Sequence, residues 1–394
     1  MKKIIKQKNL FSNKFYALVV GTLGSYILPI LLSPILTRIY TPNEFSLYTF
    51  YITIVQVISI ASTLKYDLGI PLAKDSSDRI NLFRISFINT ILISVFFFSL
   101  TYFYTLFFKN DTLEIIKFYI PMGIILQSLF SHILYNWLLS KSKFNFISIG
   151  KIIFGFTYAS LPIILFFLFG LKDFSYIIIG HQLGLLFASL VMLYNLYHAS
   201  IFSKIIFLFR VNFSDLYDIL KKYKKYAIFS SPSHLINTIG MWLPVIFIWS
   251  FFEEKYASLF FLSHRAINLP VLLLGHSIGK IFFSEALDSM NQGILNKSIS
   301  QYFKILLHIA IPFLLVCIFL SPEIFSFIFS EKWSQAGDIV RILSPWIFIT
   351  FIAAPLSTIP TIFYRQEVEL KFHSILLIFR IISLSAGVLL NNLF

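Results

Sequence analysis

Long apolar segments alternate with short polar ones along the whole chain, and the apolar segments have the length of membrane-crossing helices. A helix needs roughly 20 mostly apolar residues to cross a hydrocarbon core about 30 Å thick. The pattern therefore predicts an all-α, polytopic membrane protein with eleven transmembrane helices. The expected spans are 15–37, 45–64, 85–108, 115–140, 147–169, 174–198, 226–251, 256–283, 303–322, 339–364 and 372–392.

The polar segments predict the orientation. The N-terminus and every second polar segment after it carry about three times as many Lys and Arg residues as the segments between them. Because basic residues of short loops stay on the cytoplasmic side, we expect a cytoplasmic N-terminus. The first apolar run lacks a small-residue cleavage site, so we expect it to be a retained span. The largest segment on the opposite side, about 323–338, is too short to fold into an external domain.

Composition excludes most other classes of protein. Hydrophobic residues make up 57% of the chain and charged residues only 13%, whereas ordinary globular domains carry about 25% charged residues. The single cysteine, Cys317, excludes a disulfide-stapled scaffold. The net charge of +14 comes from basic residues in short loops between apolar runs. It therefore predicts orientation in a membrane, and no nucleic-acid partner is expected.

The polar segment 199–225 divides the chain. We expect an N-terminal lobe of six spans (1–198), a basic cytoplasmic linker (199–225) and a C-terminal lobe of five spans (226–394) that lacks a sixth. A short echo between 44–48 and 256–260 favours two related lobes of the same topology, a common transporter design. The linker's lysine run at 221–225 predicts anchoring on anionic lipid.

Basic residues enter the predicted spans, and an ionisable residue inside a membrane is a functional hypothesis by default. Arg265 lies roughly 13 Å and Arg380 roughly 12 Å from the nearer predicted span end, while Arg38 and Lys280 lie closer to span ends. Since guanidinium groups bind phosphate through a donor fork, these four residues are the candidates for binding an anionic, phosphorylated ligand. The alternatives are snorkelling for Arg38 and Lys280, and hydrogen bonds to backbone carbonyls for the other two.

Acidic residues are expected only in loops or at span ends, Asp67 being one that comes close to the membrane, and no buried carboxylate is expected. Asp67 and His264 are the candidates for gating or coupling. The histidines show no metal-ligand spacing, and no phosphate-cradling glycine loop or zinc-binding helix motif occurs. We therefore expect no catalytic residues, no metal and no cofactor.

The order of several motifs resembles that of the O-antigen and oligosaccharide flippases of bacterial polysaccharide biosynthesis. These proteins belong to the multidrug/oligosaccharidyl-lipid/polysaccharide exporter superfamily. The motifs that carry the resemblance are LSPILTRIYTPNEF (32–45), LKYDLGIPL (64–72), YKKYAIFSSP (223–232), SHRAINLP (263–270) continuing to 282, KWSQAG (332–337), LSPW (343–346) and APLST (354–358).

The resemblance implies two six-helix lobes around a V-shaped cavity that opens alternately to the two sides of the membrane. It implies a substrate in which an oligosaccharide is joined through diphosphate to a polyprenyl lipid. Arg38 and Arg265 fall within the matching motifs, and Asp67 lies where relatives carry an acidic residue. The chain departs from the family pattern in lacking a twelfth helix.

Three functions stay open at this stage. The first is a flippase that moves undecaprenyl-diphosphate-linked O-antigen or capsule units across the bacterial inner membrane and works beside a polymerase or export complex. The second is a cation-coupled multidrug exporter of the same superfamily. The third is a membrane-embedded glycan polymerase or ligase, which would need a large external loop that the sequence lacks. The first two are transporters and not enzymes.

Overall fold

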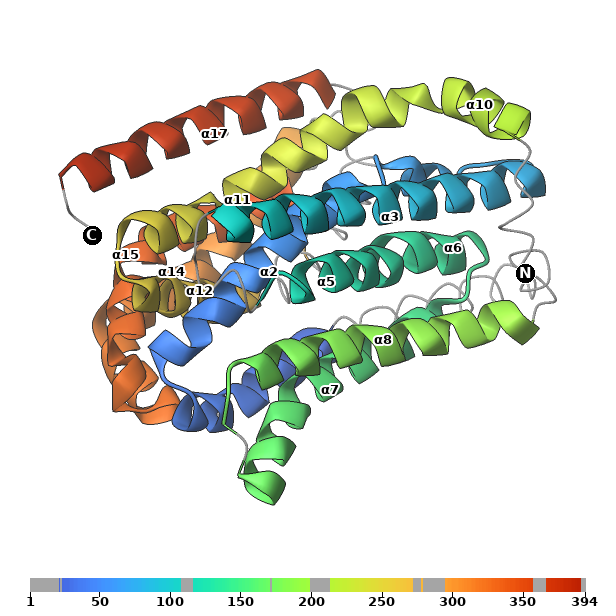
Figure 1. The fold of residues 1–394 in the computed structure, drawn as a ribbon. Coiled ribbons are helices and arrows are strands. Elements are labelled where there is room, and N and C mark those ends of the chain that lie inside the picture. Colours follow the sequence, from blue (N-terminus) through green and yellow to red (C-terminus); the bar gives the residue numbers. More distant parts are fainter. Residues whose placement is uncertain are drawn as a thin grey trace, which may run out of the picture. The chain divides into compact units, whose positions relative to one another are not determined.

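The computed structural model describes residues 21, 23–107, 116–170, 172–198, 213–271, 278, 295–356 and 366–390. Within these ranges the secondary structure is helical, without a strand (Figure 1). Nine helices in these ranges are long and apolar enough to cross a membrane. The prediction of an all-α membrane protein is therefore confirmed. The other two expected spans, 15–37 and 256–283, both include residues that the structure does not describe. The count of eleven transmembrane helices therefore stays a prediction.

The chain forms two compact units. Unit 1 comprises Met1–Leu36 and Phe50–Trp242, and unit 2 comprises Thr37–Thr49 and Leu243–Phe394. The lobe boundaries predicted at 198 and 226 stay a prediction.

Unit 1 contains the helices that follow one another through the first part of the chain. They are part of α2 (Pro42–Ser62), the 3₁₀ turn η1 (Tyr66–Gly69), α3 (Ser76–Phe107), α5 (Tyr119–Ser128), the π-helical turn η2 (Leu129–Leu134), α6 (Tyr135–Ser140), α7 (Phe144–Phe169), α8 (Ser175–His198), α10 (Phe213–Lys222), a second π-helical turn η4 (Tyr226–Ser230) and the start of α11 (Ser231–Phe251). The α5, η2 and α6 segments form one continuous span, Tyr119–Ser140.

The core of unit 1 lies where η1 and η2 meet the surrounding helices. Its fully buried members include Ile70 of the turn after η1, Leu82 of α3, Ile133 of η2 and Leu185 of α8. The α7 and α8 helices lie side by side as a hairpin (Figure 1). Their close approach is possible because Gly180 and Gly184 of α8 present no side chain to α7.

Unit 2 contains the rest of α11, α12 (Glu254–Ile267), α14 (Leu295–Phe329), the 3₁₀ turn η6 (Glu331–Trp333), α15 (Ser334–Leu356) and α17 (Gln366–Leu389). The α14 and α15 helices form the closest pair. Gly337 of α15 lies directly against the backbone of Ser321 and Pro322 in α14. The Ser321 hydroxyl donates to the Gly337 carbonyl at 2.8 Å and so bridges the same contact.

Helices extend into three segments that the sequence predicts to be polar loops or linker. The α3 helix begins at Ser76, nine residues before the expected span, and its first turns are polar. The predicted linker contains the helix α10. The external segment 323–338 is not a loop, because α14 continues to Phe329 and α15 begins at Ser334. Hydropathy marks only the part of a helix that meets lipid, so polar extensions of a helix escape it.

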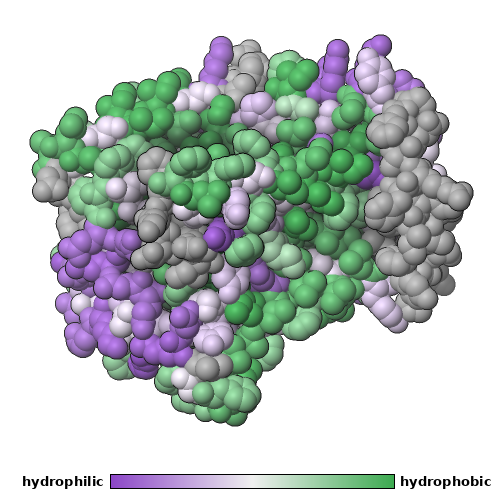
Figure 2. Space-filling view, in the orientation of Figure 1, coloured by the Kyte–Doolittle hydropathy of each residue, from purple (hydrophilic) through white to green (hydrophobic). Residues whose placement is uncertain are grey.

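Large apolar side chains cover much of the surface of both units. Figure 2 shows apolar residues spread broadly over the visible face. On α3 they include Leu92, Phe96 and Phe103, and on α7 they include Phe167 and Leu168, each more than half exposed. A soluble protein rarely exposes apolar surface on this scale, whereas a membrane protein presents it to lipid.

Candidate functional site

The predicted anion-binding residues that the structure describes, namely Arg265, Arg38 and Arg380, all lie in unit 2. Lys280 lies outside the described residues. Arg265 is half-buried on α12, next to His264. The His264 ring is stacked with Phe260 and with Trp346 of α15, with ring centroids 5.9 and 5.5 Å apart. This stack fixes α12 against α15 and so holds Arg265 on a rigid support.

Arg38 is exposed and binds the end of α14. Its guanidinium donates to the carbonyls of Ile328 at 2.9 Å and Phe327 at 3.4 Å. The last carbonyls of a helix lack partners within the helix, and a cation at this end also matches the helix dipole. The sequence offered hydrogen bonds to backbone carbonyls as the alternative role for Arg265 and Arg380. In the structure Arg38 makes bonds of this kind. They give Arg38 a structural task in unit 2, and its part in ligand binding stays a prediction.

Arg380 is half-buried on α17, a helix whose spanning window has no buried residue within the described structure. It acts electrostatically on His264. Unit 2 therefore brings Arg380 close to the α12 segment that carries Arg265. The roles of these two arginines in binding an anion stay a prediction.

Asp67 of unit 1 corrects the expectation that no carboxylate is buried. Its side chain lies in η1 and has no exposed surface. The Thr63 hydroxyl donates to Oδ1 at 2.6 Å, and the Asn136 amide donates to Oδ2 at 2.8 Å. The residue does lie just past the end of α2, as the sequence predicted, but η1 and α6 enclose it. Only the tertiary fold could show this.

The backbone before Asp67 is unusual. Leu64 and Lys65 both have positive φ angles, 47° and 58°. A non-glycine residue pays about 1–2 kcal/mol for this left-handed conformation, and two in succession are rare. Lys65 is only 4% exposed. Burial lowers the pKa of Lys65, and the charge of Asp67 partly opposes this effect.

His132 lies close to Lys65 and Asp67. It belongs to the π turn η2, which packs against η1. The charged and titratable groups that act on it electrostatically are Lys65, Asp67 and His234 of α11. π turns inside helices are frequently found at functional sites. We call Thr63, Lys65, Asp67, His132 and Asn136 the Asp67 cluster.

A second polar contact attaches the predicted linker to unit 1. Lys222, at the end of α10, donates to Oδ2 of Asp78 at 2.6 Å, and the Tyr223 hydroxyl donates to the same oxygen at 3.0 Å. Asp78 lies in the first turn of α3, where a carboxylate also matches the helix dipole. The hydrogen bond to Asp78 raises the pKa of Lys222.

The sequence identified Asp67 but missed its neighbours Lys65, His132 and Asn136. Lys65 was counted among the loop residues, and the two others lie inside an apolar span. The motif LKYDLGIPL was the available signal, since it places a lysine and an aspartate two residues apart. Among the described residues no group of three or more His, Cys, Asp or Glu could hold a metal ion.

Solved structures with similar folds are transporters. An inward-facing multidrug resistance MATE family transporter of the MOP superfamily superposes with a TM-score of 0.66, at 16% identity over 91% of this chain and 87% of the other. An outward-facing structure of such a transporter gives 0.55, at 14% identity over 91% and 84%. A MOP superfamily transporter from Pyrococcus furiosus gives 0.51, at 15% identity over 95% and 92%.

A curated relative is the teichuronic acid biosynthesis protein TuaB of Bacillus subtilis (strain 168), 21% identical over 126 residues. The aligned segment covers 32% of this chain and 26% of TuaB, so it spans about a quarter of that relative's length. The family model described as polysaccharide biosynthesis protein matches residues 35–338, well over half of the chain. The chain is therefore a multi-pass membrane protein with the fold of MOP superfamily transporters, and it belongs to the polysaccharide biosynthesis protein family.

Proposed function

We propose that this protein is a flippase for lipid-linked oligosaccharides. It moves undecaprenyl-diphosphate-linked O-antigen or capsule repeat units from the cytoplasmic to the periplasmic leaflet of a bacterial inner membrane by alternating access. The observation that carries the proposal is the match of residues 35–338 to a polysaccharide biosynthesis family on a transporter fold. The proposal also includes cooperation with a polysaccharide polymerase or export complex.

The chemistry of such a substrate divides into three parts. The polyprenyl chain is apolar and stays in lipid throughout. The saccharide needs a polar path, and the diphosphate needs positive charge in that path. Arg265 and Arg380 are the residues that we assign to the diphosphate, because guanidinium groups bind phosphate oxygens in pairs. Arg38 and Lys280 are assigned secondary contacts. Translocation then requires no covalent step and no catalytic residue.

The role of Arg265 is tested by comparing Arg265→Ala with Arg265→Lys in cells whose own flippase gene is deleted. Surface polysaccharide is measured at matched protein levels. We expect Ala to reduce it at least tenfold, a loss of about 1.4 kcal/mol or more, and Lys to retain part of it because the charge remains. Arg341→Ala is the matched control, since Arg341 is exposed and bound to Asp338 and to the Ile318 carbonyl. Normal surface polymer with Arg265→Ala would contradict the assignment.

A multidrug exporter is the second candidate, because structures of multidrug resistance transporters have the same fold. A cationic drug would need a carboxylate as its counter-charge. Both oxygens of the buried Asp67 already accept hydrogen bonds, and Lys65 lies beside it, which disfavours a cationic ligand there. Drug hypersensitivity of a deletion strain with normal surface glycan would favour the exporter. Lipid-linked units accumulating in the inner leaflet would favour the flippase.

A further inference from the structure

We propose that one face of α10 is a lipid-binding surface, which inserts into the headgroup layer of the cytoplasmic leaflet and binds the phosphate groups of anionic phospholipids. Four residues form this face, which we call the α10 stripe: Tyr217, Leu220, Lys221 and Lys224. The inference does not depend on what the protein transports.

The attachment of α10 to unit 1 decides which of its residues face outward. The helix lies beside the first turns of α3 (Figure 1), and its Ile219 is buried in the core of unit 1. Lys222 and Tyr223 both donate to Asp78 of α3. The Tyr223 N–H also donates to the Ile219 carbonyl at 2.9 Å, which continues the helical path past Lys222. One lysine of the run at 221–225 is therefore neutralised by the protein itself, and the run does not act as a whole.

The residues of the α10 stripe share one side of the helix. Those after Tyr217 follow it by three, four and seven residues, a spacing that places side chains on one helical face. Tyr217 is 66% and Leu220 37% exposed. Lys221 is exposed, and so is Lys224, which lies in the helical turn after α10. Apolar side chains beside ammonium groups are typical of a helix at a membrane surface, because the former enter the lipid while lysines bind headgroup phosphates.

Two neighbouring spans give the depth of the α10 stripe. Lys221 and Lys224 precede the apolar span Tyr226–Phe251 by five and two residues, which corresponds to roughly 3–8 Å along a helix. Asp78, to which α10 is bound, lies about 10 Å before the apolar part of α3 that the sequence predicts from residue 85. The headgroup layer extends roughly 5–8 Å beyond the hydrocarbon core. The stripe therefore lies at the level of the headgroups, on the side that the positive-inside pattern predicts to be cytoplasmic.

Charge and the adjoining surface favour lipid over an acidic protein as the partner. Besides Lys222, residues 216–225 carry three lysines against a single carboxylate, Asp218, so they attract the anionic surface of a leaflet. Apolar exposure continues into the adjoining span, where Ile228 and Phe229 of η4 are each more than half exposed. Because these two residues lie within a span and face lipid, the same bilayer covers the stripe next to them.

The proposal is tested by amide hydrogen exchange of residues 216–225 in the full-length protein. The protein is held in nanodiscs of phosphatidylcholine alone, or of an equimolar mixture of phosphatidylcholine and phosphatidylglycerol. We expect the anionic lipid to slow exchange in this segment about tenfold, because two lysines then bind a charged surface. Added sodium chloride should reduce the difference between the two lipids by screening it. Equal exchange in the two lipids overturns lipid binding and leaves a protein as the occupant of the stripe.

Matched variants show whether the α10 stripe is the binding surface. Lys221→Gln combined with Lys224→Gln should abolish the difference between the two lipids, and the corresponding double change to Arg should keep it. Lys141→Gln combined with Lys143→Gln removes the same charge from the exposed α6–α7 turn and should leave the difference unchanged. Tyr217→Ser should speed exchange in both lipids, since it removes an apolar anchor. A difference that survives the double change of Lys221 and Lys224 to Gln overturns the stripe as the lipid-binding surface.

Discussion

At the scale of single residues, buried charge in unit 1 is neutralised locally instead of being avoided. Asp67 accepts two hydrogen bonds and lies beside Lys65. Removing one partner of such a buried set typically costs about 3–5 kcal/mol, because the remaining charge loses its compensation. The hydrogen bonds of Asp67 therefore hold η1 against α6.

The contact between Lys222 and Asp78 predicts a pH dependence for the attachment of α10. The hydrogen bond raises the pKa of Lys222 above its ordinary value, so the ion pair is complete at neutral pH and is lost as the pH rises through that raised pKa. A nitroxide label at Tyr217→Cys, an exposed position on α10, should keep constant mobility from pH 6 to 9. We expect it to become mobile only at a pH above the ordinary pKa of lysine, as measured by electron paramagnetic resonance.

The control for this measurement is Lys222→Gln in the same labelled protein. Without the ammonium, the label should be more mobile at every pH and should show no alkaline step. A transition near neutral pH in the native sequence would contradict the ion pair as the group that holds α10.

At the scale of helices, the hydrophobic pattern predicted the spans well. The described span Tyr226–Phe251 coincides with its prediction, and Phe144–Phe169 begins three residues early. The pattern did not predict the turn at Leu64 and Lys65, because a pair of left-handed residues without glycine has no signal in composition. Nor did it predict that Asp67 and Asn136 meet, since they are distant in sequence and only the packing of η1 on α6 joins them.

The α14–α15 pair depends on a glycine. A Cβ atom at Gly337 would overlap Pro322 Cα and lie 2.6 Å from the Ser321 carbonyl oxygen. Both are backbone atoms and cannot move without separating the helices. We expect Gly337→Ala to destabilise unit 2 by about 1–3 kcal/mol, seen as a lower midpoint of thermal unfolding in detergent. Gln335→Ala, at an exposed position on the same helix, should leave the midpoint unchanged, and equal midpoints for the two variants would refute the close contact.

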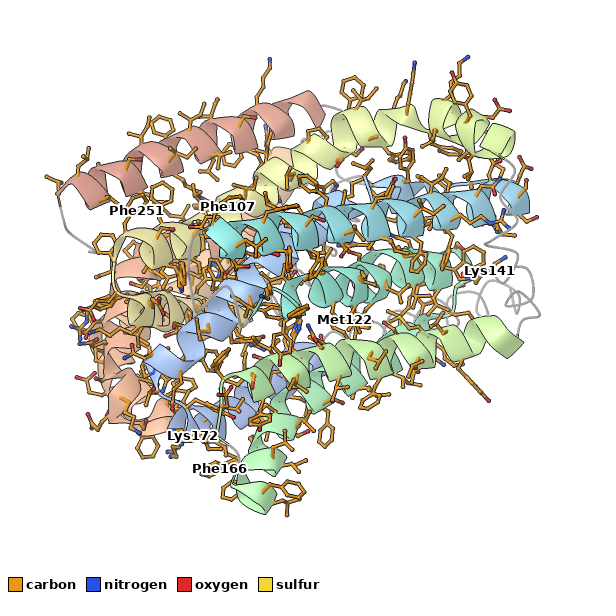
Figure 3. All side chains as sticks on the ribbon, viewed as in Figure 1. Phe107, Met122, Lys141, Phe166, Lys172 and Phe251 are labelled. Carbon is orange, nitrogen blue, oxygen red and sulfur yellow. The ribbon has the colours of Figure 1, made fainter. Side chains whose placement is uncertain are left out.

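At the scale of the whole molecule, the orientation follows from loop charge. Figure 3 places Lys141 and Lys172 at opposite ends of the helices of unit 1, one at the α6–α7 turn and the other at the α7–α8 connection. The positive-inside pattern predicts that the first end lies in the cytoplasm and the second outside. We therefore expect the Asp67 cluster and α10 to lie in the cytoplasmic half of unit 1.

A labelling experiment checks this orientation. With Cys317 replaced by serine, single cysteines are introduced at Lys141 and at Lys172, and intact cells are treated with a membrane-impermeant maleimide. We expect Lys172→Cys to react in intact cells and Lys141→Cys to react only after permeabilisation. The reverse pattern would invert the orientation and place the Asp67 cluster near the outer surface.

The π turn at Leu129–Leu134 also sets how insertions and deletions would act on this protein. A π turn holds about one more residue than the α-helical turn that it replaces, so deleting one residue there would restore a regular helix, whereas an insertion or deletion in the α-helical parts of the span would rotate all that follows by about 100°. Asn136 would then turn away from Asp67, and the buried Trp137 would leave its place. A one-residue insertion or deletion in the α-helical part of this span before Asn136 should thus be tolerated far less than a substitution.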